Sequence, residues 1–286
     1  MARLQGEDKY VPVMGIREFR TGQLAGRDEL LLHELHGERH IAKPHKHDFF
    51  IIILFDRAEG THTIDFRDYA IADRQIHLLF PGQVHRWDIG PQTIGYQLMI
   101  DRLLFERFAP YFRFSFTNYM NHPVIPCTND SFKLLKYEFD AIKDELNSDN
   151  SLKDLIGART GVIASLVSKE AENLFADLKI YQSNPRLAKF NTLIEQHFKA
   201  EKLVAFYASK LNISANYLNI LCQKNLQVSA TQLIQQRVLL EAKRLLQSTD
   251  ISIKEIAFEL GFVDHAYFSN FFKSQTGATP TEFREA

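Results

Sequence analysis

Cysteine is scarce in this sequence, and neither sign of charge is in clear excess. Cys127 and Cys222 are the only cysteines, and no CxxC pair is present, which indicates a reducing compartment and no disulfide framework. The formal net charge is −1, so we expect no overall electrostatic attraction to nucleic acid. Residues 187–286 carry eleven Lys or Arg against nine Asp or Glu, a tilt that does not by itself predict DNA binding.

Long hydrophobic runs are also lacking. No apolar run reaches the roughly 18 residues that a membrane-spanning helix needs, and the N-terminus has no basic-plus-apolar leader. We therefore expect a cytoplasmic protein without a membrane partner.

Short apolar runs broken by turn residues fill the region from Val11 to Met99. Four of them are typical of β-strands: HDFFIIILF, THTIDF, QIHLLF and TIGYQLMI. The segments DRAEG, RDYAIADR and PGQ separate them and are expected to be turns or loops. Several short strands at this spacing predict a barrel or sandwich over about residues 10–100.

Helical periodicity replaces this pattern from Asn129 onward. Apolar residues recur at three and four positions over about residues 129–178, which predicts helices that flank the barrel. Pro185, in QSNPR, interrupts the pattern, and everything from Leu187 onward has a helical period. The predicted fold is α+β with two domains, 1–181 and 187–286, joined by a linker at 182–186.

The segment TDISIKEIAFELGFVDHAYFSNFFKSQTG predicts two short helices joined by a tight turn. Ser252 and Glu255 fit a capping box, Gly261 can end the first helix in a left-handed conformation, and Asp264 can cap the second. The apolar stripe of the second helix consists of Phe268, Phe271 and Phe272. This is the pattern of a helix-turn-helix unit.

A related pattern occurs earlier, in YASKLNISANYLNILCQKN. Ala208 and Leu211 correspond to Ala257 and Leu260 at an offset of 49 residues, and Asn212 takes the place of Gly261. After a slip of one residue, an offset of 50 matches Tyr217, Leu218, Leu221 and Cys222 with Tyr267, Phe268, Phe271 and Phe272. The sequence therefore predicts two helix-turn-helix units.

A helical stretch of roughly 18 residues connects the two units, which corresponds to a rod of about 27 Å. Adjacent major-groove faces of B-DNA lie about 34 Å apart. A rigid helix of this length can hold two recognition helices in successive grooves of one duplex. The alternative is a pair of αα-hairpins in a helical bundle that binds no ligand.

The segment from Glu241 to Arg284 closely resembles the DNA-binding signature of the AraC/XylS family of transcriptional regulators, and the resemblance begins near Leu187. The residues that sit where the family pattern requires them are Ala242, Leu245, Leu246, Ile256, Ala257, Gly261, Phe262, Tyr267, Phe268, Phe272, Lys273, Gly277, Pro280 and Phe283. The resemblance implies a domain of about seven helices that binds double-stranded promoter DNA. It also implies a homodimer, with RNA polymerase as a further partner.

Carried over by position, the resemblance assigns base contacts to Asn216, Asn219, Ile220, His265, Ala266, Tyr267 and Asn270. The candidates for phosphate contacts are Ser214, Lys224, Ser252, Lys254 and Lys273. Asn can pair with adenine in bidentate fashion. Asn270 and Ile220 stand where many members carry basic residues, so we expect modest affinity per monomer and binding as a dimer. Tyr217 and Tyr267 can equally pack across their own hairpins.

Three histidines in the strand region suggest a different chemistry. His45 and His47 alternate on one face of a strand, and His85 follows a Pro-Gly turn, a set that can bind zinc or iron. Their order resembles the two motifs of the cupin barrel, but Ile51 and Ile52 stand where metal-binding cupins carry a carboxylate. We therefore expect a cupin-like effector domain without metal, and no other cofactor.

A small barrel of this type can enclose one small ligand. The candidate pocket residues are Arg20, His45, His47, Phe49, His85 and Trp87. Aromatic walls and cationic groups suit a sugar or an aromatic acid, although the same residues can serve as plain core. A homodimer seam is expected at Leu152, Leu155, Val162, Ile163, Leu166 and Val167, unless these residues pack on the barrel.

The favoured function is that of a non-enzymatic transcription factor that senses a small molecule in its barrel and binds promoter DNA sequence-specifically. The second candidate is a metal-dependent cupin enzyme fused to a helical interaction module.

Overall fold

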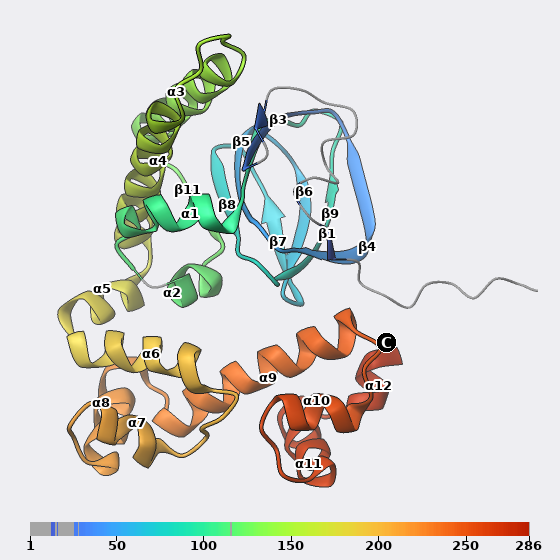
Figure 1. Ribbon diagram of the computed structural model, residues 1–286, viewed down its shortest axis with the longest axis vertical. Helices are drawn as coiled ribbons and strands as arrows, with labels where there is room; N and C mark the ends of the chain where they lie inside the picture. Colours follow the sequence, from blue (N-terminus) through green and yellow to red (C-terminus); the bar gives the residue numbers. More distant parts are fainter. Residues whose placement is uncertain (1–12, 15, 17–25, 28, 115, 286) are drawn as a thin grey trace, which may run out of the picture.

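The computed structural model of the chain describes residues 13–14, 16, 26–27, 29–114 and 116–285. Figure 1 shows β-sheets flanked by two long helices, with an all-helical part below them. The predicted two-domain α+β fold is therefore confirmed. None of the helices in the described ranges is long and apolar enough to span a bilayer.

Two facing sheets build the N-terminal domain. One contains, in spatial order, β1 (Val13–Met14), β4 (Arg39–His47), β9 (Val84–Ile89), β6 (Gly60–Ile64) and β7 (Arg67–Ile71). The other contains β11 (Val124–Pro126), β8 (Gln75–Leu79), β5 (Phe50–Arg57), β10 (Ile94–Ile100), β3 (Leu30–His36) and β2 (Gly26–Arg27). Among the described strands no pairing joins the two sheets, so the cupin-like barrel is not closed into one ladder.

Strand β5 explains why HDFFIIILF is apolar on both faces. Ile51, Ile53 and Phe55 belong to the core between the sheets. Phe50, Ile52 and Leu54 belong to a second core, which lies between the outer face of their sheet and the helices. A strand buried on both sides loses the alternation of a half-exposed one.

The turn between β6 and β7 departs from the sequence-based prediction. THTIDF was expected to be one strand and RDYAIADR a loop, but β6 ends at Ile64 and Arg67–Ile71 is strand β7. The two-residue turn consists of Asp65 and Phe66, whose φ angles are +46° and +68°. Two positive φ angles are typical of a type I′ hairpin, which usually contains Asn or Gly, so this turn carries no strong sequence signal.

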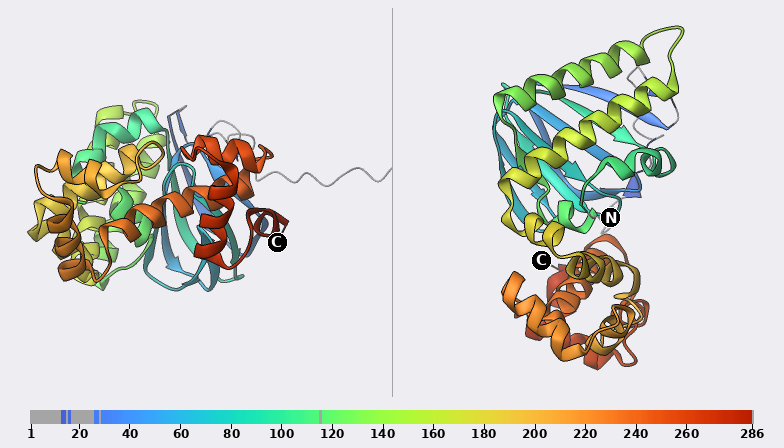
Figure 2. Two further views of the ribbon diagram at one scale, coloured as in Figure 1. Left: turned by 90° about the horizontal axis from the view of Figure 1, so that it is seen from below. Right: turned by 90° about the vertical axis from the view of Figure 1, so that its left-hand side faces the viewer.

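The helices of the N-terminal domain are α1 (Arg102–Phe108), η2 (Ala109–Tyr111), α2 (Phe116–Asn121), α3 (Asn129–Leu146), α4 (Lys153–Leu174) and α5 (Ala176–Ser183). Figure 2 shows α3 and α4 lying across the outer face of a sheet. Ile163 and Val167 on α4 are fully buried in that contact, whereas Leu155 and Val162 are 37% and 43% exposed. The residues of the predicted dimer seam are therefore divided: Ile163 and Val167 pack within their own chain.

Helices α6 (Pro185–His197), α7 (Val204–Lys210), α8 (Ala215–Leu226), α9 (Ala230–Ser248), α10 (Ile253–Glu259), α11 (His265–Thr276) and α12 (Pro280–Glu285) form the C-terminal domain. Asn184, in the predicted linker, caps α6 by accepting a hydrogen bond from the Leu187 N–H. Helix α9 contains 19 residues, which corresponds to about 28 Å. It connects the α7–α8 hairpin to the α10–α11 hairpin (Figure 1) and buries the stripe Ile234, Val238, Ala242 and Leu246.

Candidate nucleic-acid interface and ligand domain

The turns of the two hairpins have the same backbone geometry. Asn212 and Gly261 are left-handed, with φ angles of +52° and +73°. The Ile213 N–H donates to the Ala208 carbonyl at 3.0 Å, and the Phe262 N–H donates to the Ala257 carbonyl at 2.9 Å. The chain therefore contains two copies of one helix-turn-helix unit, as the 49-residue offset predicted.

The second turn also anchors its unit to the rest of the domain. A Cβ atom on Gly261 would lie 1.9 Å from the Lys199 carbonyl oxygen, so only glycine fits here. The ammonium of Lys202 donates to the Leu260 carbonyl at 2.6 Å and to the Lys199 carbonyl at 3.0 Å. These contacts fix the α10–α11 turn against the loop that follows α6.

The second helix of each unit begins with a capped turn. The Ser214 hydroxyl accepts from the Tyr217 N–H at 3.1 Å, and the Asp264 carboxylate accepts from the Ala266 N–H at 2.9 Å. The second unit has one extra residue before its cap, which accounts for the slip from 49 to 50. Val263, beside that cap, is 94% exposed.

The predicted base-contacting residues lie on the outward side of α8 and α11. Asn216, Ile220, His265, Ala266, Tyr267 and Asn270 are all exposed. Behind them, Leu218 and Cys222 on α8 and Phe268 and Phe272 on α11 are completely buried. Of the two tyrosines with an alternative packing role, Tyr267 contacts Phe262 and yet remains 66% exposed.

Asn219 differs from the other predicted base contacts. It is half-buried, and its Oδ1 accepts a hydrogen bond from the Ala230 N–H at 3.1 Å, in the first turn of α9. The side chain therefore joins α8 to α9, and one of its two polar groups is already engaged.

The predicted phosphate contacts are all exposed at the surface of the same units, and they comprise Ser214, Lys224, Ser252, Lys254 and Lys273. The Ser252 hydroxyl accepts from the Glu255 N–H at 3.2 Å within a capping box. A serine hydroxyl that accepts at a cap keeps its own hydrogen, which remains able to donate to a phosphate oxygen.

The predicted effector residues gather between the sheets of the N-terminal domain. His45, His47, Phe49, His85 and Trp87 are each at most 4% exposed. Arg20 lies outside the described residues. Two further buried histidines, His62 and His77, join this group, and sequence reasoning did not identify them. Their signal was the strand alternation, which points them inward from β6 and β8.

A cavity of about 280 Å³ lies elsewhere, where the two domains meet. Ile64, Arg67 and Tyr69 line it from the β6–β7 hairpin, and Arg237 and Lys243 line it from α9. The residues that line this cavity include none of the described residues of the predicted effector pocket.

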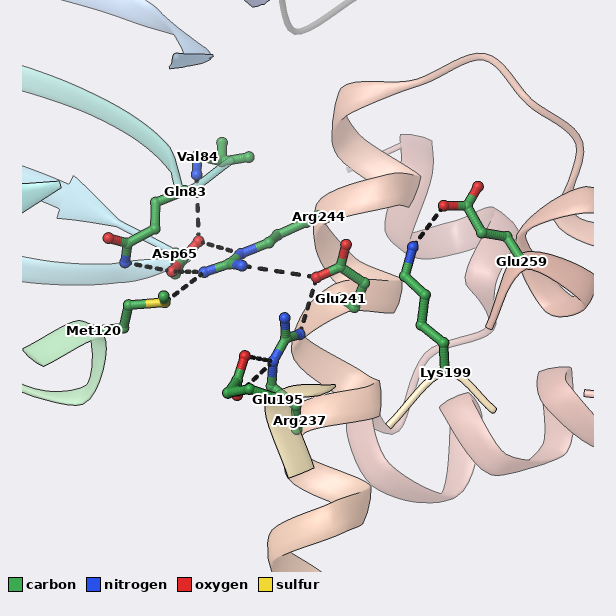
Figure 3. Close-up of polar contacts among 10 residues, drawn as sticks. All are labelled: Asp65, Gln83, Val84, Met120, Glu195, Lys199, Arg237, Glu241, Arg244 and Glu259. Carbon is green, nitrogen blue, oxygen red and sulfur yellow. Dashed lines mark hydrogen bonds and ion pairs between the residues drawn. The ribbon is translucent and has the colours of Figure 1, made fainter. Parts of the chain in front are cut away.

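The same hairpin holds the two domains together through an ion pair (Figure 3). The Asp65 carboxylate accepts from Arg244 Nε at 3.0 Å and from Arg244 Nη2 at 2.6 Å. It also accepts from Gln83 Nε2 at 2.7 Å. The side chains of Asp65 and Arg244 are only 11% and 7% exposed, so solvent hardly screens this pair.

Further charges continue the network along α9 and α6. Glu241 accepts from Arg237 at 2.9 Å and lies 3.7 Å from Arg244, while Arg237 also donates to Glu195 (Figure 3). Burial alone would raise the pKa of Glu241, but the charges of Arg237 and Arg244 outweigh this and lower it. Glu241 therefore stays ionised beside the two arginines.

Two more contacts cross the domain boundary. The Phe66 ring packs against Phe283 of α12 with centroids 5.6 Å apart, and Asn191 of α6 donates to Asn118 of α2 at 2.7 Å. None of these contacts between the domains could be predicted from the sequence, because nothing in the local patterns of these residues indicates a partner in the other domain.

Two family models match the chain. A model described as an AraC-like ligand binding domain matches residues 29–100, and one described as a helix-turn-helix domain matches residues 207–286. The chain is 30% identical over 140 residues to the arabinose operon regulatory protein of Salmonella typhimurium, a match that covers 49% of this chain and 46% of that protein. The chain spans less than half the length of several such curated relatives.

Other relatives align over more of the chain. The HTH-type transcriptional activator RhaR of Mannheimia succiniciproducens is 20% identical over 257 residues, which cover 86% of this chain and 89% of that protein. The crystal structure of ToxT from Vibrio cholerae O395 aligns with 90% of this chain and 96% of its own, at 16% identity and a TM-score of 0.43.

Proposed function

Because the chain belongs to the AraC family of transcriptional regulators, we propose that it binds double-stranded promoter DNA sequence-specifically through α8 and α11. In this proposal the two helices enter successive major grooves on one side of a duplex. The protein acts in the cytoplasm, where the DNA and RNA polymerase are found.

The repeated hairpin is the observation that carries this proposal. Two units with matching turn hydrogen bonds both expose the polar side of their second helix, and α9 connects them as a rod of about 28 Å. That length is comparable with the roughly 34 Å between adjacent major-groove faces. Exposed Asn216 and Asn270 then supply base contacts, and Lys254 and Lys273 supply phosphate contacts.

The N-terminal domain, in this proposal, binds a small-molecule effector of the sugar or aromatic-acid class and transmits its presence through the β6–β7 hairpin. Ile64 belongs to the core between the sheets and also lines the cavity between the domains. The next residue, Asp65, binds Arg244 on α9. In this proposal the β6–β7 hairpin has two arrangements relative to α9. An effector that binds one of them more tightly favours that arrangement and thereby shifts the position of the DNA-binding units.

The exposed side of the α3–α4 pair is the proposed homodimer surface. Leu155 and Val162 lie seven residues apart on α4 and are both exposed. Arg159, between them, lies over the ring of Tyr137 on α3, which is 62% exposed. A dimer doubles the number of reading helices, which compensates for the weak positive charge of each domain.

Selection of bound sequences from a random duplex pool by the full chain tests the proposal directly. We expect enriched sites with two conserved segments about one helical turn apart per subunit, and footprints that protect both. If the protein is folded and binds duplex DNA at low salt, but the selected pool shows no enriched sequence, sequence-specific binding would be contradicted. The alternative function, a metal-dependent enzyme, has no support among the relatives, which are transcriptional regulators.

A further inference from the structure

Five buried histidines lie together between the two sheets. His45 and His47 come from β4, His85 from β9, His62 from β6 and His77 from β8, and none is more than 4% exposed. The pairing of β4 with β9 places His45 directly opposite His85. A cluster of imidazoles in an apolar core needs a partner for every ring nitrogen.

The hydrogen positions follow from Gln75 at one end of the cluster. Its Oε1 accepts from the Ala72 N–H at 2.9 Å, so this atom is the oxygen, and it lies 3.1 Å from His77 Nε2. His77 Nε2 therefore carries a hydrogen. Burial lowers the pKa of His77 to about 3, so the ring is neutral and its Nδ1 has a lone pair.

The pattern then continues from ring to ring. His62 Nδ1 lies 2.9 Å from His77 Nδ1 and must donate to it, which leaves a lone pair on His62 Nε2. His85 Nδ1 lies 3.0 Å from His62 Nε2 and must donate in turn. The neutral rings of His77, His62 and His85 are thereby each fixed in one tautomer, and His85 Nε2 carries a lone pair.

The lone pair of His85 Nε2 faces a second Nε2 atom, that of His47, at 2.8 Å. In the protein alone, one hydrogen lies between these two atoms. If the hydrogen of His47 moves to Nδ1, a cation can replace the hydrogen between the two Nε2 atoms. The Nε2 atoms of His47 and His85 then direct lone pairs at the same point. This is the arrangement in which imidazoles bind metal ions.

A third nitrogen lies within reach of the same point. One ring nitrogen from each of His45, His47 and His85 lies within 4.8 Å of the others. Tetrahedral zinc, with Zn–N distances of about 2.0–2.1 Å, needs nitrogens about 3.3 Å apart, so the longest separation has to shorten by about 1.5 Å, which two side chains can share. His45 Nδ1 and Trp87 Nε1 are buried atoms for which the described part of the chain provides no hydrogen-bond partner.

The geometry points to a site for one divalent transition-metal ion, Zn²⁺ or an ion of similar chemistry, bound by His45, His47 and His85 inside the N-terminal domain. His62 and His77 are positioning residues, which hold His85 in the tautomer that offers Nε2 to the ion. No carboxylate belongs to the cluster within the described residues, so one coordination position stays open to water or another small oxygen donor. The ring of Trp87 lies beside this cluster, with its centroid 6.1 Å from that of His85.

The sequence pattern favoured a domain without metal, because Ile51 and Ile52 stand where metal-binding cupins carry a carboxylate. Three imidazoles are by themselves a sufficient ligand set for zinc. The hydrogen-bonded support from β6 and β8 could not be inferred from the spacing of His45, His47 and His85. The site does not depend on the proposed DNA binding, because metal binding is measured on the protein without DNA.

Metal titration of the chelator-treated full chain tests the inference. We expect one equivalent of Zn²⁺ by calorimetry, an increase in the thermal unfolding midpoint, and ligand-field bands in the visible spectrum when Co²⁺ is used as the probe. His62→Gln removes a positioning residue and is expected to weaken Zn²⁺ binding about 10–100-fold without changing its stoichiometry.

The control variant is His40→Ala, because His40 lies on the same strand as His45 but its side chain is 67% exposed. It is expected to bind Zn²⁺ as wild type does, whereas His47→Ala is expected to lose the site. Wild-type protein with a native circular dichroism spectrum that takes up neither Zn²⁺ nor Co²⁺ would overturn the inference, whether or not the variants fold. Equal affinity of folded His47→Ala and wild type would also overturn it.

Discussion

The carboxylate of Asp65 and the guanidinium of Arg244 are joined by two hydrogen bonds, although 179 residues separate them in the sequence. Asp65 lies at the tip of the β6–β7 hairpin and Arg244 lies near the C-terminal end of α9. The contact therefore connects the domain that contains the histidine cluster with the rod that carries both helix-turn-helix units.

We predict that Asp65→Ala destabilises the full chain, because it removes the carboxylate that forms two hydrogen bonds with the buried charge of Arg244 and leaves the more distant Glu241 in its place. Breaking a buried pair costs about 3–5 kcal/mol, and we expect about 2–3 kcal/mol here because Glu241 remains. Urea unfolding measures this loss. Asp68→Asn, on the same hairpin but exposed, is the control and should change stability by less than about 0.5 kcal/mol. Equal stability of the two variants would show that the pair contributes little.

Asn270→Ala is expected to weaken binding to the selected site by about 1–3 kcal/mol and to relax base preference at one position, because the amide can pair with adenine. Asn216→Ala should have the same effect on the segment of the site that α8 reads. Asn219→Ala is expected to lower stability as well, since Asn219 accepts from the Ala230 N–H. Gel shifts with wild-type and altered sites measure these effects, with Gln275→Ala as an exposed control on α11. Unchanged affinity and base preference in both Asn216→Ala and Asn270→Ala would remove them as base contacts.

Replacing Leu155 and Val162 together by Glu should convert a homodimer into monomers, because two charges would be buried at the proposed surface. Both side chains are exposed in the single chain, so folding should be preserved. Light scattering after size-exclusion chromatography gives the mass directly. Leu203→Glu introduces a charge at an exposed leucine of the other domain and should leave the mass unchanged. A dimeric double variant would place the interface elsewhere.

Gly261→Ala and Gly277→Ala separate backbone strain from steric overlap. Both glycines are left-handed, with φ angles of +73° and +80°, so alanine costs about 1–2 kcal/mol at either position. Only at Gly261 would the new Cβ meet a backbone oxygen, whereas the space around Gly277 is open. We therefore expect a clearly larger loss of unfolding free energy for Gly261→Ala, accompanied by weaker DNA binding. Similar losses for the two variants would contradict the tight contact with Lys199.

His77 is expected to make the metal-free protein less stable in mild acid. Burial lowers its pKa to about 3, so the unfolded chain, with an ordinary pKa near 6.5, binds more protons between these values. The contribution is complete above about pH 6.5 and is lost as the pH falls, by about 2 kcal/mol at pH 5. The difference in unfolding free energy between pH 8 and pH 5 should shrink by about this amount in His77→Gln. The exposed His40→Gln should retain the full difference.

The sequence by itself determined the features that depend on neighbouring residues. Caps, left-handed turn residues and apolar stripes lie within a few positions of each other, so the two helix-turn-helix units and α9 could be predicted, and the repeat at 49 residues identified the duplication. The break at Pro185 and the apolar character of β5 were visible for the same reason. The β6–β7 turn was missed because Phe66 adopts a positive φ that its residue type does not indicate.

Only the tertiary structure decided which distant residues meet. Asp65 and Arg244 are ordinary charges in the sequence, and their pairing depends on how the two domains pack. Likewise, the tautomer of His85 is set by His62 on a neighbouring strand and by His77 on the opposite sheet, and strand spacing carries no information on such partners. Local chemistry fixes local conformation, but contacts between segments far apart in the chain arise from packing, which buries these groups and thereby requires them to find partners.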